Sequence, residues 1–165
     1  MNAMAAPDAM SPPGLEFAFR IVLRFAEGPR LRFDSAHRAG RRGFVAVQGG
    51  EITGPRLSGR VLAGTGGDWP RFWPGGLVEF EAHYQLEADD GTPIYIHNQG
   101  IAWSAPEVLA RMEAGLPVAP DESYCRVTPR FECPPGPHEW LNRTLFVGKG
   151  ERRGARSVFD YYVVT

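Results

Sequence analysis

The stretch that decides the fold is LVEFEAHYQLEADDGTPIYIHNQG, residues 77–100. Its first half alternates strictly: the apolar set is Val78, Phe80, Ala82, Tyr84 and Leu86, and the polar set is Glu79, Glu81, His83, Gln85 and Glu87. A period of two is typical of a strand with one buried face. Asp90-Gly91 predicts a hairpin turn. The return strand then carries Ile94, Ile96 and Asn98 on one face and Tyr95 and His97 on the other. We therefore expect an antiparallel hairpin that buries the face with Phe80 and Leu86.

Shorter stretches on both sides of the hairpin also predict strands. They are residues 15–26, 43–54, 56–64, 123–133, 139–150 and 155–165. About eight to ten short strands are typical of an antiparallel barrel or sandwich, and closure into a barrel removes the exposed edges. We therefore predict an all-β, single-domain antiparallel β-barrel over residues 15–165, preceded by a disordered tail over residues 1–14.

One short helix is expected after the hairpin. Ser104 and Glu107 have the spacing of a capping box, with Pro106 at an early helical position. An apolar stripe follows, formed by Val108, Leu109 and Met112, and Gly115 is the predicted end. This helix is expected to cover an edge or plug an end of the barrel.

A second informative stretch is rich in glycine: GGEITGPRLSGRVLAGTGGDW, residues 49–69. It contains no Walker sequence, and its nearest match to a dinucleotide fingerprint, residues 64–69, ends in Trp69 and precedes a strand instead of a helix. Ile52, Leu57 and Val61 recur at intervals typical of strands. The glycines are therefore predicted where barrel strands bend and pack closely.

Composition narrows the possible partners. The chain has 165 residues, is 43% apolar and carries a net charge of −1, so neither nucleic acid nor an anionic membrane attracts it through bulk charge. No apolar run is long enough to span a bilayer, and the first residues lack the pattern of a signal peptide. We expect a cytoplasmic protein with a small-molecule ligand, no nucleic-acid or membrane partner, and a homo-oligomer such as a dimer as an open possibility.

Cysteine and histidine give no support for a cofactor or a metal. Cys125 and Cys133 form neither a disulfide framework nor a zinc pattern. The four histidines, at positions 37, 83, 97 and 138, show no recognised metal-ligand spacing. Lys149 is the only lysine and lies in a predicted turn, which disfavours Schiff-base chemistry. The prediction is no cofactor and no metal.

Four stretches of the chain carry a family resemblance. They are the glycine-rich stretch 49–69, DDGTPIYIHNQG (89–100), TPRFE (128–132) and WLNRTLFVGKGER (140–152). They resemble, in the same order, the signature stretches of the bacterial and fungal family catalogued as domain of unknown function 3237. The sequence departs from that pattern at PRFWPGG (70–76), which resembles an insertion, and at His97, where an arginine is common.

The resemblance implies a small antiparallel barrel akin to the allene-oxide-cyclase or lipocalin-like barrels, and no cofactor. Some members are linked to the breakdown of lignin-type phenolics, including decarboxylation without a cofactor. Fold and family do not by themselves fix a function, so for this chain the link is an expectation.

Candidate catalytic residues follow from the strand phase. Tyr84 and Asn98 share the inward side of the hairpin, so each is either a buried group with a structural hydrogen bond or a group that meets substrate. Arg126 stands among apolar neighbours and, if it points inward, needs a carboxylate from the protein or from a substrate. Asp68 could be that partner, or it could cap a turn. We assign Tyr84, Arg126 and Asp68 as candidate catalytic residues.

Aromatic and amide side chains complete the candidate pocket. Trp140 and Asn142 alternate with Phe146 on one predicted strand face, where Trp140 is expected in the core. His97 falls on the face opposite Asn98 and is expected to be exposed unless the strand phase slips. The candidate substrate-binding residues are Trp69, Asn98, Trp140, Asn142 and His97. Tyr84, Asn98, Arg126 and Asn142 are expected to converge on one cavity with Trp69 or Trp140 at its wall.

Two classes of function remain open. The first is a cofactor-independent enzyme that acts on a small aromatic or phenolic acid by acid–base chemistry, as a decarboxylase or another carbon–carbon lyase, or as an isomerase or cyclase. The second is a barrel that binds a small hydrophobic ligand without chemistry. Ionisable groups facing inward favour the enzyme, whereas an entirely apolar interior favours the carrier.

Overall fold

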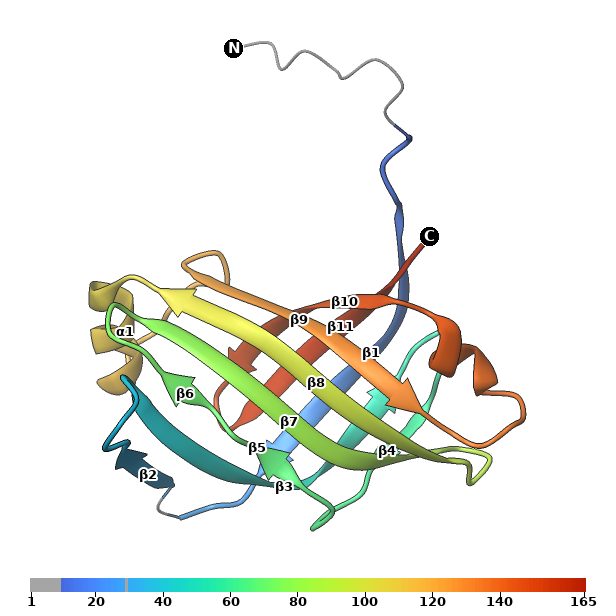
Figure 1. Ribbon diagram of the computed structural model, residues 1–165, viewed down its shortest axis with the longest axis horizontal. Coiled ribbons are helices and arrows are strands. Elements are labelled where there is room, and N and C mark those ends of the chain that lie inside the picture. The colour runs from blue at the N-terminus through green and yellow to red at the C-terminus, as the bar shows by residue number, and fades with distance from the viewer. Residues whose placement is uncertain (1–9, 29) are drawn as a thin grey trace.

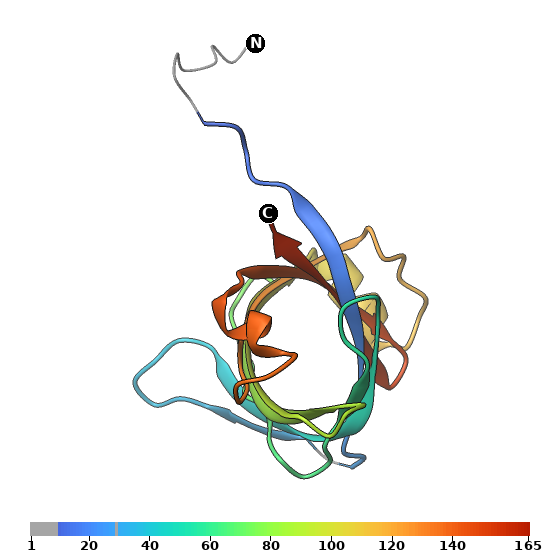
Figure 2. The same cartoon turned by 90° about the vertical axis from the view of Figure 1, so that its right-hand side faces the viewer.

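One long antiparallel sheet closes into a barrel (Figures 1 and 2). The computed structural model describes residues 10–28 and 30–165. Its strands are β1 (Leu15–Phe25), β2 (Leu31–Asp34), β3 (Arg41–Thr53), β4 (Gly59–Val61), β5 (Gly67–Asp68), β6 (Arg71–Phe72), β7 (Leu77–Ala88), β8 (Pro93–Ser104), β9 (Ser123–Glu132), β10 (Phe146–Arg153) and β11 (Arg156–Val164). The helices are α1 (Pro106–Glu113) and the 3-10 helix η1 (Glu139–Arg143).

The barrel closes through an antiparallel pairing of β1 with β3. The order around it is β1-β11-β10-β9-β8-β7-β4-β3. Three short strands, β4, β5 and β6, together occupy the position between β3 and β7. The short strand β2 pairs with β3 at the end of the strand order. The predicted all-β antiparallel barrel with one short α-helix is confirmed. None of the helices in the described part of the chain is long and apolar enough to cross a bilayer.

The hairpin of β7 and β8 has the predicted phase. Tyr84 and Leu86 are 1% and 0% exposed, whereas Glu79 is exposed. Phe80 is half-buried and points inward over Gly100, where a Cβ would lie 2.7 Å from its ring. The connecting loop holds three residues, because Ala88 and Thr92 still share a backbone hydrogen bond of 3.0 Å. The loop length sets the register, in which His83 lies opposite His97.

Aromatic rings fill one end of the barrel. Phe19, Phe131, Phe146 and Tyr161 lie with ring centroids 5.0–6.2 Å apart. Gly148 faces the same interior, and a Cβ there would lie 2.6 Å from Val127 and 3.0 Å from the Tyr161 ring. Burial of such a ring contributes about 1.5–3 kcal/mol. The 3-10 helix η1 lies across this filled end of the barrel, and α1 lies at the opposite end (Figures 1 and 2).

The glycine-rich stretch packs closely against neighbouring strands, as expected. A Cβ at Gly50 would lie 2.2 Å from the carbonyl oxygen of Val22, and one at Gly66 would lie 1.7 Å from that of His83. Neither position tolerates a side chain unless the backbone moves. These contacts let the broken strand β4–β6 pass between β3 and β7.

Some local predictions were wrong. Residues 139–143 form η1 instead of the start of a strand, and the strand begins at Phe146. Ala105, not Ser104, is the N-cap of α1, because the Ser104 hydroxyl pairs with that of Ser123 at 2.8 Å. Strand β2 was not expected at all. In the predicted tail, residues 1–9 lie outside the described residues, while Gly14 pairs with Thr165 through two backbone bonds of 3.0 Å.

Candidate functional site

Two adjoining cavities occupy the α1 end of the barrel. The inner cavity has a volume of about 170 Å³ and lies between Leu23, Val47, Ala82, Asn98, Cys125 and Phe159. The mouth cavity has a volume of about 160 Å³ and lies between Arg30, Leu31, Arg32, Pro70, Phe72 and Val78. Five residues line both: Phe25, Asp68, Phe80, Arg152 and Ser157. The two cavities therefore lie side by side, with these five residues between them.

Asp68 is the carboxyl residue that lines both cavities, and Glu151 lines the inner one. β5 pairs Asp68 with Val45 of β3 and with Ala82 of β7, and strand alternation directs its side chain inward while Trp69 lies on the outside. Burial raises the pKa of Asp68 to about 6, although backbone groups of Glu81 and Trp69 and the charge of Arg30 oppose the rise. A carboxyl group with a pKa near neutrality can both accept and return a proton.

Two residues of the inner cavity carry buried polar atoms without a partner. In the described residues, five buried side-chain polar atoms lack a hydrogen-bond partner, and four of them belong to Asp68, Tyr84, Asn98 and Tyr161. Folded proteins pair nearly all such atoms. Asp68 and Asn98 both line the inner cavity, so their unpaired oxygens can meet a polar group of a ligand there.

The tyrosines of this region stay neutral. Burial raises the pKa of Tyr84 above its ordinary range, the negative charge of Asp68 raises it further, and Tyr161 opposes the rise. Burial also raises the pKa of Tyr161 well above its ordinary range. Each hydroxyl therefore keeps its proton at neutral pH, and the Tyr84 hydroxyl lies within the electrostatic reach of Asp68. Tyr84 lines neither cavity and lies one inward position below Ala82 on β7.

Cys125 shares the inner cavity but is not a nucleophile there. Burial raises the pKa of its thiol to about 11, and the charge of Asp68 adds to the rise. At neutral pH the group is a thiol, and the thiolate is the reactive form. Cys125 and Cys133 are both free.

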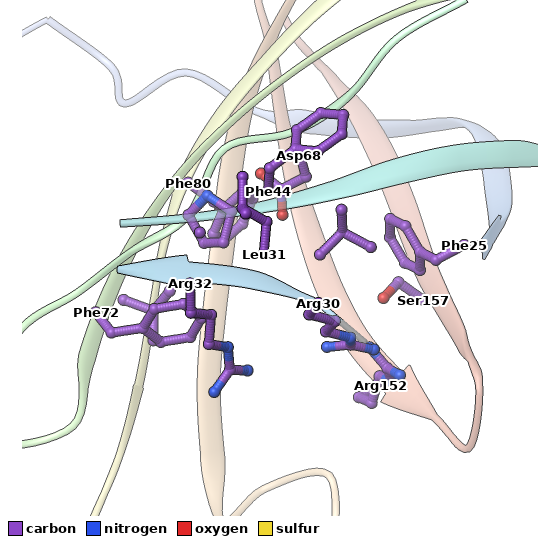
Figure 3. A pocket seen from close by; sticks show the side chains of 14 residues that line it. Phe25, Arg30, Leu31, Arg32, Phe44, Asp68, Phe72, Phe80, Arg152 and Ser157 are labelled. Carbon is purple, nitrogen blue, oxygen red and sulfur yellow. The ribbon is translucent and has the colours of Figure 1, made fainter. Parts of the chain in front are cut away.

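Two arginines supply positive charge at the opening. Arg152 lines both cavities, and its Nε donates to the carbonyl oxygen of Gly154 at 2.6 Å. Burial lowers the pKa of Arg152, and so does the charge of Arg30 beside it. Figure 3 shows Arg30 and Arg152 together on one side of the mouth cavity, with Asp68 on the other. An anionic group on a ligand would be attracted to this pair.

The structure brings only some of the predicted site residues together. Asp68 and Asn98 line the inner cavity, and Tyr84 lies below it. Arg126 lies on the outer face instead, because its neighbours Cys125 and Val127 take the inward positions of β9. Its guanidinium lies 4.7 Å from the centre of the Tyr124 ring and donates to the carbonyl oxygen of Cys125 at 2.9 Å.

Asn142 and Trp140 lie at the filled end of the barrel, away from the cavities. The Asn142 amide accepts from the backbone N–H of Cys133 at 2.8 Å and donates to the carbonyl oxygen of Cys133 at 2.9 Å. Trp140 packs on Phe146 at 5.7 Å, with the Arg56 guanidinium 4.1 Å above its ring. The expected convergence of Tyr84, Asn98, Arg126 and Asn142 on one cavity therefore does not occur.

Trp69 and His97 lie on the outer face of the barrel wall. Trp69 is 38% exposed, and its ring centre lies 5.1 Å from that of Phe44 and 5.9 Å from that of His83. His97 stacks on His83, as expected for the face opposite Asn98. Glu81, His83 and His97 place one ligand atom each within 4.8 Å of one another and are the described residues that could hold a metal ion.

Arg30 and Arg152 carry no sequence pattern that marks them as site residues. Arg152 ends the stretch WLNRTLFVGKGER and falls between the predicted strands 139–150 and 155–165, so no strand phase was assigned to it. Arg30 comes from the segment between β1 and β2, whose path no periodic pattern predicts. The available signal was the nearly exclusive use of arginine for positive charge, which does not say which arginines meet in space.

The chain is similar in sequence to several known proteins. The family described as "Protein of unknown function (DUF3237)" matches residues 13–164. A UPF0311 protein of Rhodopseudomonas palustris is 39% identical over 125 residues, which cover 76% of this chain and 81% of that protein. A protein of Penicillium herquei named "Hydroalkoxylation enzyme phnH" is 32% identical over 91 residues, which cover 52% of this chain and 54% of that protein. The chain is therefore distantly related to a fungal enzyme.

Solved structures share the barrel. The conserved protein of unknown function RPA1785 from Rhodopseudomonas palustris superposes with a TM-score of 0.83 at 33% identity, covering 95% of this chain and 100% of that one. A β-barrel-like protein from Acinetobacter baumannii gives 0.82 at 30% identity, covering 96% and 100%. An enzyme from Penicillium herquei gives 0.69 at 21% identity, covering 97% and 100%, and shares the fold.

Proposed function

The chain belongs to the family described as protein of unknown function DUF3237, and from this premise we propose that it is an acid–base enzyme. Its substrate is a small aromatic molecule, of the phenolic-acid type, held in the adjoining cavities. The reaction is a proton transfer of the isomerase or cyclase class, and it needs no cofactor. Asp68 carries the proton.

The observation that carries this proposal is the state of Asp68. Its carboxyl group is buried, its Oδ1 has no hydrogen-bond partner among the described residues, and its pKa is raised to about 6. A general acid or base works best when its pKa lies near the operating pH, and a positioned one contributes about 10²–10⁴-fold in rate. Backbone groups of Glu81 and Trp69 form hydrogen bonds to the carboxyl group, whereas Oδ1 has no partner and stays available to a substrate.

The size and walls of the site favour one aromatic ring. A dry cavity of about 150 Å³ holds a benzene-sized molecule, and the inner cavity is of this order, at about 170 Å³. Phe25, Phe80 and Phe159 supply aromatic surface around it. Arg30 and Arg152 at the mouth then suit an anionic substituent such as a carboxylate.

The name of the fungal relative favours the reaction class. Hydroalkoxylation adds an O–H group across a C=C bond: the oxygen loses its proton and forms the new C–O bond, and the other alkene carbon gains a proton. No electrons are exchanged with a third molecule. One carboxyl group with a pKa near neutrality can accept the first proton and return one, which is the role assigned to Asp68.

Decarboxylation is the second candidate, and the two arginines favour it. Protonated Asp68 would deliver a proton to the carbon that bears the carboxylate, which converts a para-phenolate substrate into a quinone methide. The bond to the carboxylate held at Arg152 would then break, its electron pair would restore the aromatic phenolate, and carbon dioxide would leave. The products separate the two reactions, because only decarboxylation releases carbon dioxide.

The test compares the wild type with Asp68→Asn, which removes the proton carrier, and with Asp121→Asn, which removes an exposed carboxylate. Metal-stripped proteins are incubated in D₂O with phenolic acids and alkenyl phenols, and products are followed by NMR and mass spectrometry. Wild type and Asp121→Asn should incorporate deuterium into product at equal rates, while Asp68→Asn should be slower by about 10²-fold or more.

Three outcomes would revise the proposal. Full activity of Asp68→Asn would remove Asp68 from the chemistry. Activity that disappears with the chelator and returns with a metal would refute a cofactor-free reaction. Tight binding of the aromatic acids without turnover of any of them would identify a ligand-binding barrel instead.

A further inference from the structure

We propose that Glu81, His83 and His97 form a binding site for a divalent transition-metal ion, such as Zn²⁺, on the outer wall of the barrel. The site lies on the opposite face of β7 and β8 from the inner cavity and does not depend on the function proposed for Asp68.

Register brings the three side chains together. Glu81 and His83 are two residues apart on β7, so both point outward. His97 of β8 lies directly opposite His83 in the antiparallel ladder. The two imidazole rings stack with centroids 4.1 Å apart and an interplanar angle of 15°. Both ligand-bearing strands belong to the closed wall, so their spacing is held by the backbone ladder.

The ligand atoms already have distances close to those of a metal site. The Nε2 atom of His83 lies 3.3 Å from Oε1 of Glu81, and Nε2 of His97 lies 2.9 Å from the same oxygen. All three ligand atoms lie within 4.8 Å of one another. Ligands about 2.0–2.1 Å from a tetrahedral zinc ion are roughly 3.3 Å apart. Small side-chain adjustments would therefore suffice for all three to reach one ion.

A neighbouring hydroxyl orients one of the imidazoles. Nδ1 of His83 forms a hydrogen bond with the hydroxyl of Tyr95. When this nitrogen is occupied, Nε2 is the atom left for a metal, and it is the atom that faces Glu81. Metal-binding histidines almost always have such a partner on their second nitrogen. This contact distinguishes the trio from a chance group of surface residues.

The chemistry of the ligand set indicates the type of ion. Two neutral imidazoles and one carboxylate are a set that zinc uses in sites with an open fourth position, and imidazole also suits Cu²⁺ and Ni²⁺. Glu81, His83 and His97 keep side-chain exposures of 47%, 35% and 27%, so solvent reaches the site. A fourth ligand would be water or an anion from solution.

The test measures metal binding directly. Chelator-stripped wild type is titrated with Zn²⁺ and Ni²⁺ by calorimetry and in competition with a chromogenic chelator. Co²⁺ is added to observe its ligand-field absorption. Trp69, whose ring lies edge-on to His83 at 5.9 Å, gives a fluorescence signal for Cu²⁺ or Ni²⁺. One ion per chain is expected, with affinity at least 10-fold lower in His83→Gln and in His97→Gln, and about 10–100-fold lower in Tyr95→Phe.

Matched controls separate this site from other groups. His37→Gln, an exposed histidine elsewhere, and Asp68→Asn should bind the ion as the wild type does. Equal affinity in wild type and the double variant of His83 and His97 would overturn the proposal. If a variant fails to fold in a thermal melt, anomalous diffraction from wild-type crystals grown with Zn²⁺ decides, because the ion must lie about 2.0–2.2 Å from all three residues. An ion elsewhere, or none, overturns the proposal too.

Discussion

Ala82 lies directly opposite Asn98 across β7 and β8, and both residues line the inner cavity. The next pair along the same two strands, His83 and His97, faces outward. One step along the backbone thus separates the proposed proton-transfer site from the proposed metal site. Because the two sites are on opposite faces of one wall, substitutions can test each site without removing side chains of the other.

Filling the inner cavity should abolish ligand binding without unfolding the barrel. Ala82→Leu directs extra side-chain volume into a cavity of about 170 Å³, so the larger residue has space to occupy. Thermal unfolding should change little, since overpacking strains a core chiefly where no space exists. Binding of aromatic acids, measured by calorimetry, should be lost. A variant that binds these acids as the wild type does would show that the ligand site lies elsewhere.

Arg152→Gln should weaken binding of anionic substrates selectively. A hydrogen bond to a charged group is worth about 1.5–3 kcal/mol, which predicts an increase of KM by roughly 10-fold or more for a carboxylate substrate. A neutral analogue of the same ring should show little change. Arg156→Gln on β11 is the matched control, because Arg156 lines neither cavity. Equal effects on the charged and neutral ligands would contradict an anion-binding role.

Asn142→Ala should act on stability and leave ligand binding unchanged. Its amide makes two hydrogen bonds to the backbone of Cys133 and joins η1 to the end of β9. Their loss is expected to cost about 1–3 kcal/mol in the free energy of unfolding, measured by urea denaturation. A raised KM with unchanged stability would instead return Asn142 to the substrate-binding group.

Local periodicity predicted much of the fold. The alternation in residues 77–87 gave the correct inward face, because on a strand the side chains at i and i+2 share one side of the sheet. The failure at residues 139–143 has a physical cause. Trp140, Asn142 and Phe146 imitate alternation, but tertiary contacts of Asn142 with Cys133 and a turn bond from Leu141 to His138 stabilise a 3-10 helix there.

The candidate site was harder to predict, because it depends on pairing between distant strands. A two-residue turn at Asp90-Gly91 would have placed His97 opposite Tyr84, whereas the observed three-residue loop places it opposite His83. Arg126 was assigned to the interior from its apolar neighbours, but those neighbours, Cys125 and Val127, hold the inward positions themselves. The sequence gives little information on the length of the β7–β8 loop, and therefore on which residues of the two strands pair.

The effect of pH on stability provides a test of Asp68 that does not require a substrate. The pKa of Asp68 is raised from 3.8 to about 6 by burial, so the folded state holds the proton more tightly than the unfolded state. Stability from this group is fully present below pH 4 and is lost as pH rises from about 4 to 6. One pKa unit corresponds to about 1.4 kcal/mol, so the loss is about 3 kcal/mol in total. Asp68→Asn does not titrate and lacks this loss.

The measurement is urea denaturation of wild type and Asp68→Asn at intervals between pH 4 and pH 7. Other carboxylates titrate in both proteins, so the difference between the two free energies of unfolding isolates Asp68. That difference should move by about 3 kcal/mol in favour of Asp68→Asn as pH rises through the window. Asp121→Asn, which removes an exposed carboxylate, should follow the wild type throughout. Parallel profiles for wild type and Asp68→Asn would mean that Asp68 titrates like an exposed carboxyl group, and the acid–base role proposed for it would then lose its basis.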